Sequence, residues 1–337
     1  MRTVNNEKGA VVVFITLMIV LLLAMVGMGL DTGQLTYTRS QGQAAVDAAA
    51  LSAVSGLPLG AAQVAGRVAA FDSNNDYLSS PSNSIKASNI TYIHYDSATG
   101  AITNLPDITN ADGLRVALEK TNPYTSVAAG TAMKSPVFLT PLMKLLGQSA
   151  PATADVSVSA VAVLKAIPGT PIAIMQKVCN GSQTIHDVLL TRAPSTTDNS
   201  CWTTFLDNPV SAPKINEYLK ATQSCSGLPK GLDQYVTIGT DIYLNNGVVN
   251  STYDDAHTAF IDNNPGQCWL VPVVPDSTQC NKSDPIVGWA TICPTEVTKT
   301  GSDKYVKADV TCNQDPYRAK DNLCFSSRLV RDTKSGM

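Results

Sequence analysis

One uninterrupted apolar run near the start dominates the hydropathy pattern of the chain. From Ala10 to Leu30 there is no charged residue, and Thr16 is the one clearly polar side chain. At about 1.5 Å of rise per residue, a helix of this length spans about 30 Å, the thickness of the hydrocarbon core of a bilayer. The run therefore predicts a transmembrane helix over residues 10–30, preceded by a short N-terminal segment over residues 1–9.

A cleavable signal peptide is the competing interpretation of the same run. Its apolar region is normally about 7–15 residues long and is followed by a small-x-small cleavage site. The run here is longer, and Gly27, Gly29 and Asp31 do not form a clean site of that kind. The pattern favours a retained membrane anchor.

The charges on the two sides of the run predict its orientation. Arg2 and Lys8 precede it, whereas Asp31 follows it and the first basic residue on that side is Arg39. Short basic flanks remain in the cytoplasm. We therefore expect a cytoplasmic N-terminus, with residues 31–337 on the other side of the membrane.

The residues after the run are rich in alanine and other good helix formers. Nothing breaks the helical pattern strongly between Thr36 and Ser55, so we expect the membrane helix to continue outward as a stalk until Gly56 and Pro58. Gly42 is a weak position in that stalk, since glycine costs about 1 kcal/mol relative to alanine in a helix interior. A second helix is predicted over residues 61–71, where apolar side chains share one face.

The pattern then changes to alternating apolar and polar positions, which is typical of strands. Strands are expected over residues 90–95, 113–119 and 154–163, the last with one polar face, and a helical turn over residues 141–146. The segment Pro168-Gly169-Thr170-Pro171 then marks a domain boundary. Residues 31–165 are thus predicted to form a stalk followed by a small β-rich domain.

Residues 172–337 are predicted to form a second domain, mostly β or α+β. Strands are expected over residues 235–244, 269–274, 286–293 and 305–312, and helices over residues 213–222 and 253–262. Turns rich in asparagine and glycine separate them at residues 246–247 and 264–266. The fold class expected for the whole chain is therefore α+β.

All the cysteines lie in this second domain, and none forms the C-x-x-C spacing that structural zinc and thioredoxin-type sites require. An even number confined to one region of a membrane-anchored chain indicates disulfides formed in an oxidising compartment. Reduced cysteines in a cytosolic core are the alternative, and the pairing of eight cysteines stays open among 105 possibilities. The disulfide candidates are Cys179, Cys201, Cys225, Cys268, Cys280, Cys293, Cys312 and Cys324.

Charge and composition exclude some classes of partner. The chain has 24 basic and 27 acidic residues without long charge runs, whereas a nucleic-acid-binding protein needs a basic face. The bilayer is the expected partner of residues 10–30, and neither nucleic acid nor a small-molecule substrate is predicted.

Candidate catalytic and metal-binding patterns are weak. His94, His186 and His257 are far apart and none lies in H-E-x-x-H, while phosphate-loop and nucleophile-elbow motifs are also missing. His257 follows Asp254 and Asp255, which a solvated helix face explains better than a metal site. A Ser-His-Asp site assembled from distant residues stays open, because such triads are defined by geometry. No catalytic residue, metal ligand or cofactor is predicted.

The N-terminal pattern resembles the TadE/TadG-like proteins of bacterial tight-adherence (Tad, or Flp) pilus systems. The resemblance implies a single-span protein of the bacterial inner membrane with its bulk in the periplasm, bound to protein partners in a pilus assembly or secretion complex. The residues that match the family pattern are Gly9, Asp31, Arg39, Gln43, Asp47, Ala48, Ala49, Ala50 and Leu51.

The chain also departs from that family in informative ways. Gly42 stands where the family usually has leucine, which makes a straight stalk less assured. Gly9 is followed five positions later by Phe14 rather than by the glutamate of a processed prepilin. The expected function is a non-enzymatic assembly component; the alternatives are a surface-exposed minor pilin or adhesin and a periplasmic enzyme.

Overall fold

The computed structural model describes residues 5–74, 85–118, 132–145, 147–179, 181, 183–193, 199–225, 228, 232–245, 250–276, 280–299, 303–317 and 324–331. The chain divides into two compact units. Unit 1 comprises residues 1–93, 104–162 and 329–337, and unit 2 comprises residues 94–103 and 163–328. The two units are described separately below.

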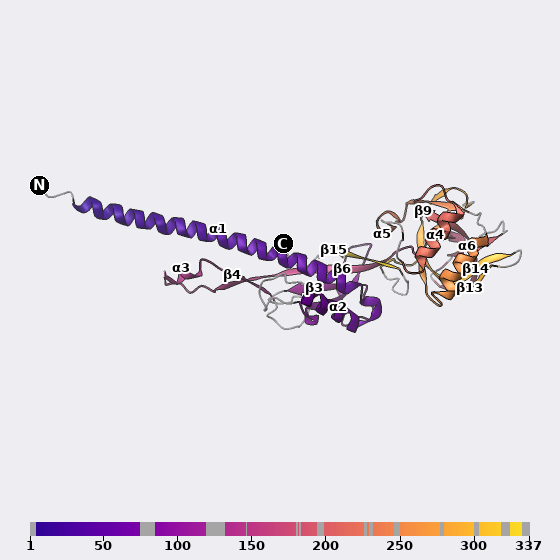
Figure 1. Cartoon of the computed structure of the whole chain (residues 1–337), viewed down its shortest axis with the longest axis horizontal. Helices are drawn as coiled ribbons and strands as arrows, with labels where there is room; N and C mark the ends of the chain where they lie inside the picture. The colour runs from indigo at the N-terminus through magenta and orange to yellow at the C-terminus, as the bar shows by residue number, and fades with distance from the viewer. Residues whose placement is uncertain are drawn as a thin grey trace. The chain divides into compact units, whose positions relative to one another are not determined.

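The longest element of unit 1 is the helix α1 (Asn5–Val54), which includes both the apolar run and the expected stalk (Figure 1). Among the described residues it is the one helix long and apolar enough to cross a membrane. The side chains of residues 11–23 are all exposed, as a lipid-facing surface requires. The N-terminal apolar helix is thus confirmed, and by length and composition it is a candidate membrane span.

The second half of α1 buries one face against the rest of unit 1. Small side chains on that face let neighbouring elements approach the helix closely. The buried residues there are Ala45, Val46, Ala49, Ala50, Ala53 and Val54. The helix ends just before Gly56, and α2 (Ala61–Asn74) then turns back and packs Val64 and Val68, both fully buried, beside it.

A five-stranded sheet and a hairpin supply most of the remaining elements of unit 1. The sheet has the strand order β15-β6-β3-β1-β2 among the described residues. Strands β1 and β3 are antiparallel, with Ile90 opposite Val116. The bounds are η1 Leu57–Leu59, η2 Ala87–Asn89, β1 Ile90–Tyr95, β2 Ile102–Asn104, β3 Gly113–Leu118, β6 Val158–Ala166 and β15 Phe325–Val330.

A separate two-stranded hairpin runs along α1. Its strands β4 (Met133–Pro136) and β5 (Thr153–Val156) are antiparallel, with Met133 opposite Val156. The short helix α3 (Thr140–Leu145) lies between them at the tip of the hairpin. This helix confirms the helical turn predicted over residues 141–146, of which Leu146 lies outside the described residues.

Unit 2 is built on an eight-stranded sheet with the order β12-β10-β9-β7-β11-β13-β14-β8. Neighbouring strands are antiparallel except β7 and β11, which are parallel with Ile174 beside Val273. The strands are β7 Ile172–Met175, β8 Thr184–Ala193, β9 Ser200–Phe205, β10 Asp241–Asn245, β11 Trp269–Val274, β12 Ser283–Pro285, β13 Gly288–Thr298 and β14 Lys304–Cys312. The helices are η3 Gln176–Val178, α4 Ala212–Thr222, α5 Leu232–Tyr235, α6 Asn250–His257 and the π-helix η4 Thr258–Asp262.

Both faces of this sheet are covered, which explains its uninterrupted apolar strands. Along β7, Ile172 and Ile174 point into one core, together with Phe260 of η4. Ala173 and Met175 point into a second core on the other face. Because successive side chains alternate between faces, every position of a strand that is covered on both sides is buried, and the strand is apolar along nearly its whole length.

The strands predicted over residues 90–95 and 269–274 match β1 and β11. The strand predicted over 154–163 is instead two strands, β5 and β6, that separate at Ser157. The expected polar face is also wrong for β6, which is buried along most of its length because α1 lies against this region. The segment 235–244 begins as the end of α5 and becomes a strand only at Asp241. The domain division at residues 168–171 stays a prediction.

Candidate functional site

One face of α1 packs against the hairpin and the sheet of unit 1, and it includes Asp31 of the family-matching residues. Gly27, Asp31, Thr38 and Gly42 follow one another at spacings of four, seven and four residues. This spacing keeps them on one side of a helix. Gly27 is partly buried, and the other three residues are buried. We call residues 27, 31, 38 and 42 the hairpin-binding face.

Asp31 fixes the tip of the hairpin to α1. Its carboxylate accepts hydrogen bonds from the backbone N–H groups of Phe138 and Leu139, at 2.5 and 3.2 Å. These two residues precede α3, so the carboxylate satisfies backbone donors just before that helix. Hydrogen bonds to an ionised acceptor are roughly twice as strong as neutral ones. Asp31 is only 9% exposed, so its contacts with solvent are few.

Two glycines of the hairpin-binding face leave room for hairpin side chains. A Cβ atom added at Gly27 would lie 2.8 Å from Cγ of Leu139. A Cβ atom added at Gly42 would lie 2.5 Å from Sδ of Met133, whose side chain is fully buried. The departure from leucine at position 42 is therefore a packing requirement of this hairpin, and α1 continues through Gly42 without a break.

Polar side chains of α1 also form hydrogen bonds with the hairpin and with β6. Thr38 Oγ1 donates to Ser135 Oγ of β4 over 3.2 Å, and both residues are buried. Gln43 Nε2 lies 2.8 Å from Asp47 Oδ1 and 2.8 Å from the carbonyl oxygen of Ser159 in β6. Gln43 thus donates both to its neighbour one turn along α1 and to the sheet.

The remaining family-matching residues occupy different positions on α1. Gly9 lies in the first turns of the helix, and Arg39 and Ala48 are exposed. Ala49 and Ala50 are fully buried, and Leu51 is partly buried. The structure therefore divides these residues between buried positions, which unit 1 itself explains, and exposed positions.

The cysteines of unit 2 all pair with one another. The bridges are Cys179–Cys312, Cys201–Cys280, Cys225–Cys324 and Cys268–Cys293, with Cα–Cα distances of 5.4, 5.4, 5.5 and 4.2 Å. Three of the four connect residues at least 79 positions apart. The bridges therefore join elements that are distant along the chain and brace the sheet.

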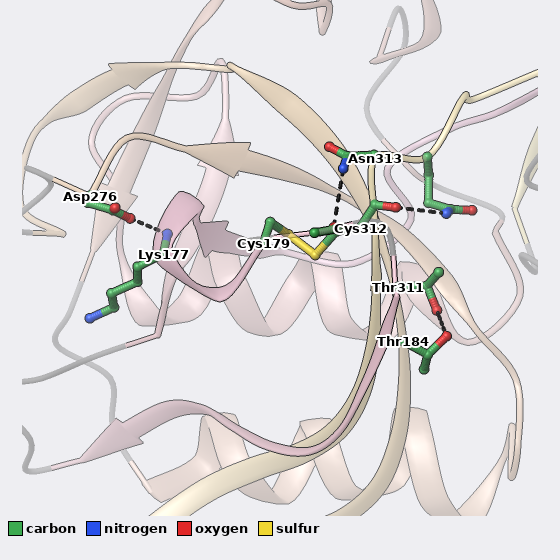
Figure 2. Close-up of a disulfide and its surroundings, with 9 residues drawn as sticks. Lys177, Cys179, Thr184, Asp276, Thr311, Cys312 and Asn313 are labelled. Carbon is green, nitrogen blue, oxygen red and sulfur yellow. Dashed lines mark hydrogen bonds between the residues drawn. A yellow bond between two sulfur atoms is a disulfide. The ribbon is translucent and has the colours of Figure 1, made fainter.

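The Cys179–Cys312 bridge ties the end of η3 to the end of β14 (Figure 2). Hydrogen bonds surround it: the Lys177 N–H donates to the carboxylate of Asp276, and the hydroxyls of Thr184 and Thr311 lie 2.9 Å apart. The three tryptophans lie in the cores of unit 2, with exposures of 2% for Trp202, 0% for Trp269 and 6% for Trp289. They share these cores with bridge cysteines.

Ion pairs line the exposed edge formed by β8 and β14. Arg192 donates from Nε and Nη2 to the two oxygens of Asp303, at 2.8 and 2.5 Å. These hydrogen bonds, together with the guanidinium charge, lower the pKa of Asp303. The Lys307 ammonium lies 2.8 Å from Asp187, and the hydrogen bond to that carboxylate raises the pKa of Lys307. Such exposed pairs contribute little to stability.

The described residues contain no arrangement of three or more histidine, cysteine, aspartate or glutamate side chains that could hold a metal ion. His186 and His257 each lie beside a single carboxylate, with 3.0 Å between Nδ1 of His186 and Asp309 and 3.3 Å between Nδ1 of His257 and Asp262. Asp96 accepts from the N–H groups of Ala98 and Thr99, as in an ordinary turn. His186, His257 and Asp96 therefore each have a polar partner within the fold.

Sequence reasoning missed the hairpin's attachment to α1. No contact with α1 was predicted for five residues that each touch it: Met133, Ser135, Phe138, Leu139 and Ser159. The signal in the sequence was the spacing of Gly27, Asp31, Thr38 and Gly42 on one helix face, which marks a surface for close packing.

Comparison with known proteins gives one match, over part of the chain. Residues 9–63 match the family described as "Putative Flp pilus-assembly TadE/G-like". No curated protein and no solved structure matches the chain. The matched residues run through α1 and η1 into the start of α2, and so include the apolar helix and the hairpin-binding face. An apolar helix within such a segment fits a membrane-anchored component of a Tad pilus, and residues 9–63 are therefore a TadE/G-like segment of the Flp pilus-assembly family.

Proposed function

We propose that this chain is a non-enzymatic assembly component of a Tad/Flp-type pilus or secretion system in the bacterial inner membrane. The observation that carries the proposal is that the TadE/G-like segment at residues 9–63 coincides with α1. In this arrangement the first part of α1 holds the protein in the bilayer, and the second part supports the sheet and hairpin of unit 1.

The proposed topology has the N-terminus in the cytoplasm and residues 31–337 in the periplasm. Two observations support it. Arg2 and Lys8 lie on the N-terminal side of the apolar run, where short basic flanks favour the cytoplasm. The four disulfides of unit 2 lie on the other side of it in the sequence, and disulfides persist in oxidising compartments. Residues 31–165 and 172–337 are proposed as its two exported domains.

A protein partner in the pilus complex is part of the proposal. Arg39 and Ala48 are exposed, and they are the members of the family-matching pattern on the stalk that the fold of unit 1 does not use. A binding surface for another assembly component would explain why these positions fit the family pattern.

Gene deletion with defined complementation tests the function. Deletion is expected to abolish surface pili, and the full chain should restore them. Residues 31–337 exported by a cleavable signal peptide should fail to do so, because they lack the anchor. Normal piliation in the deletion strain would overturn the proposed function, and full rescue by the released form would overturn the need for the anchor.

Fractionation separates this function from that of a minor pilin or adhesin. An assembly component should sediment with inner membranes after pili have been sheared from the cells. Recovery with the sheared pili would favour the alternative. Protease added to spheroplasts should digest residues 31–337; full protection of these residues would contradict the topology.

A further inference from the structure

The tip of the β4–β5 hairpin, residues 137–145, is apolar and partly exposed. Phe138 is 55% exposed and Met143 is 37% exposed, although both are large apolar side chains. Val137, Leu139 and Leu142 beside them are partly buried. Neighbouring exposed apolar side chains on a folded protein mark a surface that contacts a partner or a membrane.

The position of this tip along α1 indicates which environment surrounds its exposed side chains. Leu139 packs against Gly27, which lies inside the uninterrupted apolar run that ends at Leu30. Gly27 is four residues from Asp31, or about 6 Å along the helix axis. The hairpin therefore descends about one helical turn past the polar end of the run, to a level where the helix around it faces lipid.

We infer that this tip inserts the apolar side chains of Phe138, Leu142 and Met143 into the phospholipid leaflet on the Asp31 side of the membrane, beside the transmembrane helix. The protein would then be held by the span of α1 and by a second, shallow contact. This contact is continuous with the lipid-facing surface of the helix. The inference requires only that α1 spans the bilayer.

The backbone of the tip suits a nonpolar environment. Backbone that enters a bilayer must satisfy its hydrogen-bonding groups within the protein, since each unsatisfied group costs several kcal/mol. The N–H groups of Phe138 and Leu139 donate to Asp31, and that of Val137 donates to the carbonyl oxygen of Ala152. The N–H of Met143 donates to the carbonyl oxygen of Leu139.

The remaining polar groups of the tip are also arranged for this position. Pro141 has no N–H to satisfy. The Thr140 hydroxyl donates to the carbonyl oxygen of Pro151 over 2.6 Å. Lys144 is exposed in the last turn of α3, and a lysine near the membrane surface is attracted to anionic lipid headgroups. The tip thus combines apolar side chains, four backbone N–H groups whose acceptors lie within the protein, and one basic residue.

Quenching by brominated lipid tests this insertion in the full-length protein. The three native tryptophans are buried in unit 2 and supply a constant background. The variant Phe138→Trp, reconstituted in phosphatidylcholine–phosphatidylglycerol vesicles, should gain a blue-shifted emission that bromines near the headgroup end of the acyl chains quench. Bromines near the bilayer centre should quench it less.

The matched control is Leu59→Trp. Leu59 is 63% exposed in η1, beyond the end of α1 and far along the chain from the apolar run. Its added emission should be red-shifted and unaffected by bromine. Met143→Trp reports on the same tip in case Phe138→Trp does not fold, as judged by resistance to protease.

Two results would overturn the inference. A red-shifted, unquenched emission at both tip positions would mean that the tip remains in water. A blue-shifted but unquenched emission would mean that a second copy of the chain or another protein covers the tip instead of lipid. In both cases the proposed role in pilus assembly would still stand, because piliation and fractionation test it separately.

Discussion

The carboxylate of Asp31 and the backbone N–H of Phe138 lie within 2.5 Å of each other, although 107 residues separate them in the chain. Asp31 is the first charged residue after the apolar run, so this hydrogen bond attaches the hairpin where the helix leaves the apolar segment. Together with the contact between Gly27 and Leu139, it fixes the hairpin to α1 at both sides of that boundary.

Replacing Asp31 by alanine is expected to release the hairpin tip. The substitution removes the acceptor of two backbone donors, and hydrogen bonds to charged groups contribute about 1.5–3 kcal/mol. Amide hydrogen exchange at Phe138 and Leu139 should therefore accelerate strongly. Asp31→Asn retains one acceptor oxygen and should have a smaller effect. Thr32→Ala, at an exposed neighbouring position, is the control; equal protection in all variants would contradict the role of Asp31.

Replacing Gly42 by leucine, the residue usual in the family, is expected to destabilise unit 1. The new side chain would overlap Met133, and overpacking of this kind costs about 1–3 kcal/mol. The free energy of unfolding of unit 1, measured by hydrogen exchange in detergent, should fall accordingly.

Adding Met133→Ala should recover part of this loss, because the space vacated by methionine can accept leucine. A double-mutant cycle measures that coupling directly. Gly33→Ala is the matched control, since nothing lies within 4 Å of the added Cβ. That variant should gain up to about 1 kcal/mol from helix propensity. Additive effects of Gly42→Leu and Met133→Ala would contradict the proposed packing.

Reduction is expected to destabilise unit 2 more than unit 1, because all four bridges lie in unit 2. Hydrogen exchange with and without dithiothreitol gives the comparison. Equal loss of protection in residues 31–165 and 172–337 would contradict it.

The individual bridges should differ in their contribution. Cys225–Cys324 closes 99 residues and Cys268–Cys293 closes 25. Loop-closure entropy in the unfolded chain gives about 4–5 kcal/mol for the first and about 3–4 kcal/mol for the second. Paired Cys→Ser variants should therefore lower the unfolding temperature of unit 2 more for the longer loop. The reverse order would show that strain or residual structure outweighs loop length.

The Arg192–Asp303 pair predicts a pH-dependent contribution at the exposed edge of unit 2. Because the folded-state pKa of Asp303 is lowered from its ordinary value of 3.8, the pair stabilises the fold above that pH. The contribution is lost as the pH falls through the lowered pKa. In Arg192→Gln the pKa of Asp303 should rise toward 3.8, as measured by carboxyl NMR titration.

Lys307→Gln is the control for this titration, because Lys307 pairs with Asp187 instead. It should leave the pKa of Asp303 unchanged. An unchanged titration of Asp303 in Arg192→Gln would mean that the guanidinium does not hold the carboxylate in solution.

Regular elements with a strong local pattern could be predicted from the sequence. The apolar helix, the β1 and β11 strands and the α4 helix depend on the periodicity of their own residues, which is readable along the chain. The segment 235–244 was predicted less well. Apolar side chains such as those of Tyr235 and Val236 occur at the end of a helix as well as in a strand, so their type does not distinguish the two. The loop at Asn246–Gly247 lies outside the described residues.

The sequence by itself determined the membrane helix, the concentration of disulfide cysteines in one half and the TadE/G-like pattern, because each depends on residue type and spacing over a short stretch. Tertiary structure alone decided which cysteines pair and why Gly42 and Asp31 stand where they do. Met133 and Phe138 lie about a hundred residues away, and the free energy of those contacts depends on the path of the chain in space. Local hydropathy carries no information about that path.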